Sequence, residues 1–142
     1  MNTSSRFAVA VHVLSLLATT PGPVSSVHIA GSVNTNPVLI RRILGQLGRA
    51  GFTQSLRGAT GGTLLARAAA EINLLDVYRA VEQPGVLGLH RSDPNPACEV
   101  GRNITRVLGG VFDRAQDAVE RVIESMTLHD IVRQLKVKQA TR

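Results

Sequence analysis

The sequence predicts a mainly α-helical protein with a small β-hairpin, organised as a winged helix-turn-helix followed by a long C-terminal dimerisation helix. Three observations support this fold class. Apolar residues recur at helical spacing over most of the 142 residues, and two short extended runs flank a glycine-rich loop at 57–62. Aromatic residues make up only 3% of the chain, so the core must consist mainly of aliphatic side chains.

Two helices are expected before residue 35. The first begins near Ser4 or Ser5 and ends at the Thr-Pro-Gly-Pro sequence of residues 20–23, which cannot continue a helix. After a short extended step, Ser25 or Ser26 is expected to cap a brief second helix.

The third helix follows the sharpest turn signal in the chain. Asn36 is a good N-cap and Pro37 suits the first helical position, so we expect a helix over residues 38–50 with Gly51 as its C-terminal stop. Its apolar positions should face the core, and its arginines should remain outside. The inward positions are Leu39 or Ile40, Ile43, Leu44 and Leu47, and the outward ones are Arg41, Arg42 and Arg49.

After the third helix the pattern becomes extended. Residues 52–56 and 63–66 are predicted to be two strands, joined by a loop longer than the minimal hairpin turn. This hairpin is the expected wing. Asn73 then caps a fourth helix, which Pro84-Gly85 should end.

A Pro- and Gly-rich loop over 83–101 separates these elements from a long helix over residues 102–125. Its wide apolar stripe must pack against another surface, either a second copy of the chain or the chain's own winged half. The interface residues expected on this stripe are Ile104, Leu108, Val111, Ala115, Val119 and Val122. Thr127 can cap a short last helix over 128–135, before a polar tail that should be frayed.

Positive charge is concentrated in the first half of the chain. The first 70 residues contain six arginines and no Asp or Glu, so they account for the whole formal net charge of +6. A surface of one sign indicates a polyanionic partner, most commonly nucleic acid, although a basic face can also serve solubility. We therefore divide the chain into a winged helix-turn-helix DNA-binding domain over 1–83, a candidate sensing loop over 84–101, and the dimerisation helix with the terminal helix over 102–142.

The third helix and the wing are the elements that should meet duplex DNA. A helix fits the major groove, where its first residues meet base edges and its guanidinium groups reach guanine or phosphate. The Asn36-Pro37 start should also point unpaired backbone N–H groups toward a phosphate oxygen. The candidate contacts are Ser26, Asn36, Pro37, Val38, Arg41, Arg42, Arg57, Gly58, Thr60 and Gly61.

In the wing, Arg57 could enter the minor groove, where negative potential is focused. Gly58, Gly61 and Gly62 would let the backbone approach a sugar-phosphate surface. The alternative is that these glycines only shape the turn.

Four motifs resemble the Rrf2 family of regulators, which includes IscR, NsrR and CymR. The resemblance extends to Thr127-Leu128-x-Asp130 and implies a homodimer in which the two long helices cross and present two winged heads to a palindromic operator. It also implies DNA contacts from the third helix and the wing. The motifs are Asn36-Pro37-Val38, Leu47 through Ala50-Gly51, Arg57-Gly58-x-x-Gly61-Gly62-x-Leu64-Leu65-Ala66-Arg67, and Ile72-x-Leu74-x-Asp76-Val77.

One departure from this family concerns cysteine. Cluster-binding members hold an iron-sulfur cluster with three cysteines between the fourth and the long helix, and here that stretch contains only Cys98. We therefore expect no cluster, metal or other cofactor, the alternative being a cluster shared by two Cys98 residues of a dimer. Cys98 is a candidate redox sensor because a helix start raises thiol reactivity, or else it is an inert thiol beneath the loop.

The sequence offers no residues for enzyme chemistry, since it has no paired carboxylates, nucleophile elbow or triad order. We expect a sequence-specific transcriptional repressor or activator that responds to an unknown redox or small-molecule signal. Two alternatives are a thiol-dependent redox protein using Cys98 and His90, and a sequence-neutral DNA-compacting protein. The single cysteine and the short N-terminal apolar run favour a cytoplasmic location without membrane association.

Overall fold

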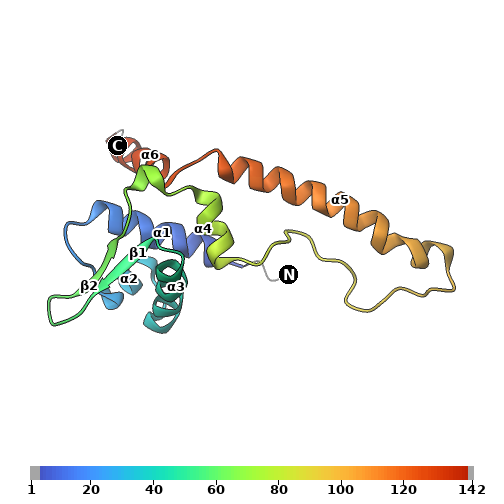
Figure 1. Ribbon diagram of the computed structural model, residues 1–142, viewed down its shortest axis with the longest axis horizontal. Helices are drawn as coiled ribbons and strands as arrows, with labels where there is room; N and C mark the ends of the chain where they lie inside the picture. The colour runs from blue at the N-terminus through green and yellow to red at the C-terminus, as the bar shows by residue number, and fades with distance from the viewer. Residues whose placement is uncertain (1–3, 141–142) are drawn as a thin grey trace. The chain divides into compact units, whose positions relative to one another are not determined.

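The computed structural model describes residues 4–140, with side chains described up to residue 136. Within that range it contains six α-helices, a short 3-10 helix and one two-stranded antiparallel hairpin (Figure 1), which confirms the predicted fold class. The chain divides into two compact units, of which the first comprises Met1–Glu82 with Glu124–Arg142 and the second Gln83–Ile123. We call the first unit the head.

The head carries the predicted winged helix-turn-helix order. The hairpin strands pair from Thr53 opposite Leu65 to Leu56 opposite Gly62. The head's elements are α1 (Arg6–Thr19), α2 (Ser26–Val33), α3 (Pro37–Arg49), β1 (Thr53–Leu56), β2 (Gly62–Leu65), η1 (Ala69–Glu71), α4 (Leu74–Val81) and α6 (Leu128–Ala140).

The extended step between α1 and α2 attaches the hairpin to the helices. Val24 and Thr63 exchange two backbone hydrogen bonds of 3.0 and 2.9 Å, so Val24 extends the hairpin by one isolated bridge. The core beneath is aliphatic, as expected, and is assembled from all the head helices. Its most completely buried members include Val13, Leu14, Ile29, Ile40, Ile43, Leu47, Val77 and Leu128.

Local capping fixes both ends of α3. Asn34 adopts the left-handed conformation (φ 63°) that ends α2, and the Asn36 Oδ1 atom accepts a hydrogen bond of 2.7 Å from the Val38 N–H. At the other end, Gly51 has φ 84°, which suits a residue without Cβ and ends the helix where the sequence predicted. The turn between α2 and α3 is therefore determined by its own residues.

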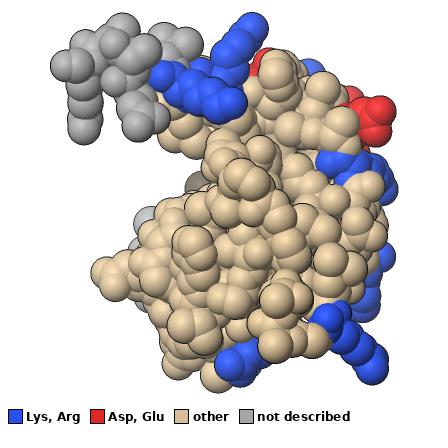
Figure 2. Space-filling model, turned by 90° about the vertical axis from the view of Figure 1, so that its left-hand side faces the viewer, with Lys and Arg blue, Asp and Glu red and all other residues tan. Residues whose placement is uncertain are grey.

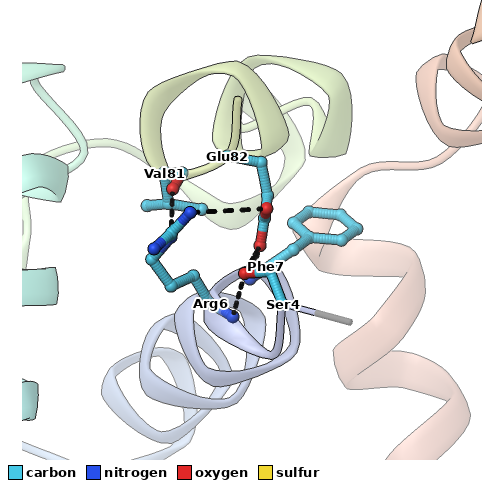
Figure 3. Close-up of polar contacts among 5 residues, drawn as sticks. All are labelled: Ser4, Arg6, Phe7, Val81 and Glu82. Carbon is cyan, nitrogen blue, oxygen red and sulfur yellow. Dashed lines mark hydrogen bonds and ion pairs between the residues drawn. The ribbon is translucent and has the colours of Figure 1, made fainter. Parts of the chain in front are cut away.

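The start of α1 is capped by a residue that is distant in the sequence. Ser5, at the N-cap position, makes no side-chain capping bond, but the Ser4 hydroxyl accepts a hydrogen bond of 3.2 Å from the Arg6 N–H, so Ser4 acts as one of the expected caps. In addition, Glu82 at the end of α4 accepts hydrogen bonds from the Ser4 hydroxyl (2.6 Å) and the Phe7 N–H (3.1 Å) (Figure 3). The guanidinium of Arg6 lies 3.9 Å from the same carboxylate and donates to the Val81 carbonyl at 3.0 Å. Glu82 thereby joins α1 to α4.

The later helices differ from their predicted boundaries. The long helix α5 (Glu99–Glu124) begins three residues early, and α4 ends at Val81, before Pro84. The terminal helix α6 continues to Ala140, so the expected frayed tail after residue 135 is wrong over that stretch, where helix-forming Lys, Gln and Ala predominate. Helix α6 packs on α1 and η1 within the head, whereas the sequence grouped it with the long helix.

A reciprocal capping pair starts α6. The Thr127 N–H donates to Asp130 Oδ2 (2.9 Å), and the Asp130 N–H donates to Thr127 Oγ1 (3.3 Å). The first of these hydrogen bonds lowers the pKa of Asp130 below its ordinary value. This arrangement confirms Thr127 as the predicted cap.

Because the Glu82 carboxylate is half-buried and accepts two hydrogen bonds, Glu82→Ala should lower the free energy of unfolding by about 1–3 kcal/mol. Urea unfolding followed by circular dichroism measures the change. Glu71→Ala removes an exposed carboxylate from the same unit and should change stability by no more than about 0.5 kcal/mol. Equal stability losses in the two variants would contradict the capping role.

Candidate nucleic-acid interface

Helix α3 has one buried face and one exposed basic face. Ile40, Ile43 and Leu47 are completely buried. At 3.6 residues per turn, the positions at spacings of three, four, seven and eleven from residue 38 lie on the opposite face. These exposed-face residues are Val38, Arg41, Arg42, Gly45 and Arg49, which we call the recognition face.

The expected phosphate site at the start of α3 is not available. Pro37 has no N–H, the Val38 N–H donates to the Asn36 side chain, and the Leu39 and Ile40 N–H groups donate to the Asn36 carbonyl at 3.1 and 3.4 Å. The prediction of unpaired N–H groups at this helix start is therefore wrong, because the cap that forms the helix also uses its donors.

A groove of about 500 Å³ lies between α3 and the hairpin. Its helical wall includes Arg41 and Arg49, and Ser26 at the start of α2 also borders it. Two helical glycines, which have no side chains, leave this wall open. The remaining lining residues are Leu44, Gly45, Gly48, Ser55, Leu56, Gly62 and Thr63.

The hairpin tip is exposed, and its glycines have different roles. A Cβ at Gly61 would collide with the Leu56 carbonyl oxygen, and one at Gly62 would lie 2.7 Å from the Val24 carbonyl. These two glycines therefore close the hairpin on the chain's own backbone, as the turn-shaping alternative stated. Gly58 has φ 107° and open space around it, and it lies beside the exposed residues Arg57 and Thr60.

Two of the six N-terminal arginines serve the fold. Arg6 pairs with Glu82, and the Arg67 guanidinium lies 5.1 Å from the centre of the Phe52 ring while donating to the Ala50 carbonyl at 3.4 Å. The other four are exposed and form no ion pair in the described part of the chain. They are Arg41, Arg42, Arg49 and Arg57. Figure 2 shows one face of the molecule, on whose lower edge the charged side chains are basic.

The structure therefore brings together only part of the predicted set. Ser26 and Arg41 line the groove, Val38 and Arg42 lie beside Arg41 on the recognition face, and Asn36 caps α3. The residues from Arg57 to Thr60 form the hairpin tip. The prediction of contact residues omitted Arg49, Gly45 and Gly48. The signal for the two glycines was their place inside a helix, where each costs about 1 kcal/mol relative to Ala and so indicates a need for space.

The second unit consists of the loop after α4 and most of α5. Gln116 is the one buried residue of α5, and its Oε1 atom accepts hydrogen bonds from the N–H groups of Gly85 (3.2 Å) and Val86 (3.0 Å). None of the six predicted interface residues is buried, and Val111 and Val122 are exposed. The other four are half-buried, so the apolar face of α5 is only partly covered in a single copy of the chain.

The donors of this unit do not fit an iron-sulfur cluster. Cys98, the only cysteine of the chain, is exposed immediately before α5, and its carbonyl accepts the Arg102 N–H at 2.8 Å. No group of three or more His, Cys, Asp or Glu residues within residues 4–140 could hold a metal ion. His90 is likewise exposed, and no hydrogen bond joins it to Cys98 in the described structure. None of the described helices has the length and apolar character that a membrane span requires.

Known proteins resemble this chain over nearly its whole length. The Rrf2 family model, described as an iron-dependent transcriptional regulator, matches residues 3–134. YwnA of Bacillus subtilis (strain 168), a candidate HTH-type transcriptional regulator, is 41% identical over 132 residues, which are 93% of this chain and 98% of YwnA.

Solved structures lead to the same family. T. potens IscR superposes with a TM-score of 0.74 at 27% identity, covering 98% of this chain and 91% of IscR. CymR, the global cysteine regulator of B. subtilis, gives a TM-score of 0.68 at 26% identity, covering 94% and 98%. Transcriptional regulators are not enzymes, which argues against a redox enzyme. The chain belongs to the Rrf2 family of winged-helix, DNA-binding transcriptional regulators.

Proposed function

We propose that two copies of the chain bind a palindromic operator, with each α3 in a major groove and each hairpin tip toward the adjoining minor groove. One observation carries this proposal: four arginines without acidic partners lie on the recognition face of α3 and on the hairpin tip. Four guanidinium groups without an acidic partner attract a polyanion, and an α-helix with one free face fits the major groove.

Residues at different positions along the recognition face of α3 are placed for different contacts with DNA. Arg41 and Arg42 lie one turn from the helix start, where side chains reach guanine edges or the flanking phosphates. Gly45 and Gly48 keep the helix wall of the groove low, so a DNA backbone can approach it, and Arg49 lies in the same groove. Arg57 on the hairpin would face the minor groove.

The partly exposed apolar face of α5 supports the dimer. Its residues recur at spacings of three, four and seven, the pattern by which two helices pack along a common seam. Val100, Val107, Val111 and Val122 are all exposed in the single chain, and exposed valines repeated along one helix indicate a protein interface. We propose that the covering surface is the α5 of a second copy.

The same proposal includes regulation without a bound cluster. The chain has one thiol where a cluster needs several thiolates, so its signal must act by other chemistry. Cys98 is exposed at the start of α5, and its role as a redox sensor stays a prediction. A sensor at this position would act on the helix that joins the two copies.

Two arginine variants distinguish a side chain that contacts DNA from one that only stabilises the fold. Arg49→Ala should weaken duplex binding and reduce the slope of log affinity against log salt by about one for each phosphate that the guanidinium neutralises. Arg67→Ala removes the same charge from a side chain that packs on Phe52, and it should leave the slope unchanged. Fluorescence anisotropy across salt concentrations measures both slopes, and equal reductions in the two variants would contradict the assignment.

Selection from a random duplex pool tests the operator itself. The wild-type chain should bind the selected palindrome at least about 10³-fold more tightly than a scrambled duplex of the same length. A sequence-neutral DNA-compacting protein would bind both duplexes equally, with a steep salt dependence in each case.

The same assay tests the dimer through two α5 variants. Val111→Glu places a charge on the proposed seam and should give monomers by sedimentation velocity, with operator affinity at least about tenfold weaker because one head remains per binding event. Arg106→Glu adds the same side chain about 140° around the helix, at an exposed position, and should stay dimeric. A Val111→Glu protein that remains dimeric would contradict the proposed seam.

A further inference from the structure

Val38 is an exposed apolar side chain on an otherwise polar recognition face. Its exposure is 54%, although the apolar residues two and five positions later, Ile40 and Ile43, are completely buried. On the helix surface Val38 neighbours Arg41 and Arg42, at spacings of three and four. The fold does not use this side chain, since it lies opposite the core.

The position of Val38 is also well defined. Its N–H is held by the Asn36 side chain at 2.7 Å, and Pro37 before it restricts the backbone. A β-branched side chain in a helix has one strongly preferred rotamer. Val38 therefore presents its two methyl groups in a fixed direction from the first turn of α3, the turn from which a recognition helix reaches base edges.

The chemistry of the major groove limits what such a side chain can contact. Guanine and adenine present hydrogen-bonding atoms there, and cytosine presents its amino group, so an isopropyl group placed against them would leave polar atoms unpaired. Thymine alone among the four bases presents a C5-methyl group, with which an apolar side chain makes a favourable contact.

We propose that Val38 contacts the C5-methyl group of a thymine and that each operator half-site carries thymine at this position. This inference rests on the proposed operator binding, and it specifies which base the operator carries at one position of each half-site. The neighbouring arginines support it, because guanidinium groups on both sides would place the valine between two contacts to the DNA.

Deoxyuridine tests the contact directly, because it pairs as thymine does and lacks only the methyl group. Each thymine of the selected operator is replaced in turn, in both half-sites together, and affinities are measured for the wild type, Val38→Ser and Val27→Ser. Val27 is the matched control, since it is the second residue of α2 as Val38 is of α3, and it is 67% exposed. Thermal unfolding verifies that both variants fold.

In the wild type, one symmetric replacement should weaken binding by about 15-fold, the effect of removing two buried methyl groups from the DNA, one in each half-site. In Val38→Ser the ratio between thymine and deoxyuridine operators should fall to about one at that position, and in Val27→Ser it should stay at the wild-type value.

Wild-type binding that is insensitive to deoxyuridine at every position would overturn the inference, as would a thymine preference that persists in Val38→Ser. The first result is also what a protein partner at Val38 would produce. If Val38→Ser fails to fold, Val38→Ala takes its place in the same comparison. Failure of operator binding itself is seen beforehand, as equal affinity of the wild type for operator and scrambled duplex, and it overturns both proposals.

Discussion

The burial of one face of α3 is the constraint on which the interface depends. Ile40, Ile43 and Leu47 are completely buried, and their packing fixes the rotation of the helix about its own axis. Once that rotation is fixed, helical geometry places Arg41, Arg42 and Arg49 on the other side. A rotation by one residue, about 100°, would turn the arginines away from their present direction and expose apolar residues. The core therefore determines which side chains DNA can reach.

The hairpin is held by contacts that leave no room for side chains. Gly61 approaches the Leu56 carbonyl, and Gly62 approaches Val24, whose backbone also pairs with Thr63. Because Val24 lies between α1 and α2, the hairpin is attached to the helical part of the head as well as to its own turn. These contacts set one wall of the groove, and the glycines of α3 keep the other wall low. The glycine positions therefore determine the shape of the interface, and the arginine positions determine its charge.

Features that depend on neighbouring residues were predictable from the sequence. The cap at Asn36, the stop at Gly51, the cap at Asn73 and the hairpin all agree with the structure, because each is determined within a few residues. Features that depend on distant residues were not. The carboxylate that caps α1 belongs to Glu82, which lies 75 positions after Phe7, whose N–H donates to it. The same carboxylate pairs with Arg6, so Arg6 does not contribute to the basic surface that faces DNA.

The Arg67 guanidinium likewise packs on the Phe52 ring. The number of arginines in the first half of the sequence therefore overestimated how many can bind DNA. The predicted phosphate site at the start of α3 failed because Asn36 occupies the donors that capping and phosphate binding would both require. The sequence thus predicted the fold and the principal helix, and the structure was needed to separate binding arginines from structural ones.

The most direct measurement follows the arginine side chains themselves. Nitrogen-15 NMR spectra of the Nε–Hε groups, recorded while duplex DNA is added, report each guanidinium separately. If α3 and the hairpin form the interface, the signals of Arg41, Arg42, Arg49 and Arg57 will shift together, while those of Arg6 and Arg67 stay in place. Shifts at Arg6 and Arg67 with no change at the other four would contradict this assignment, since DNA would then occupy a surface other than α3 and the hairpin.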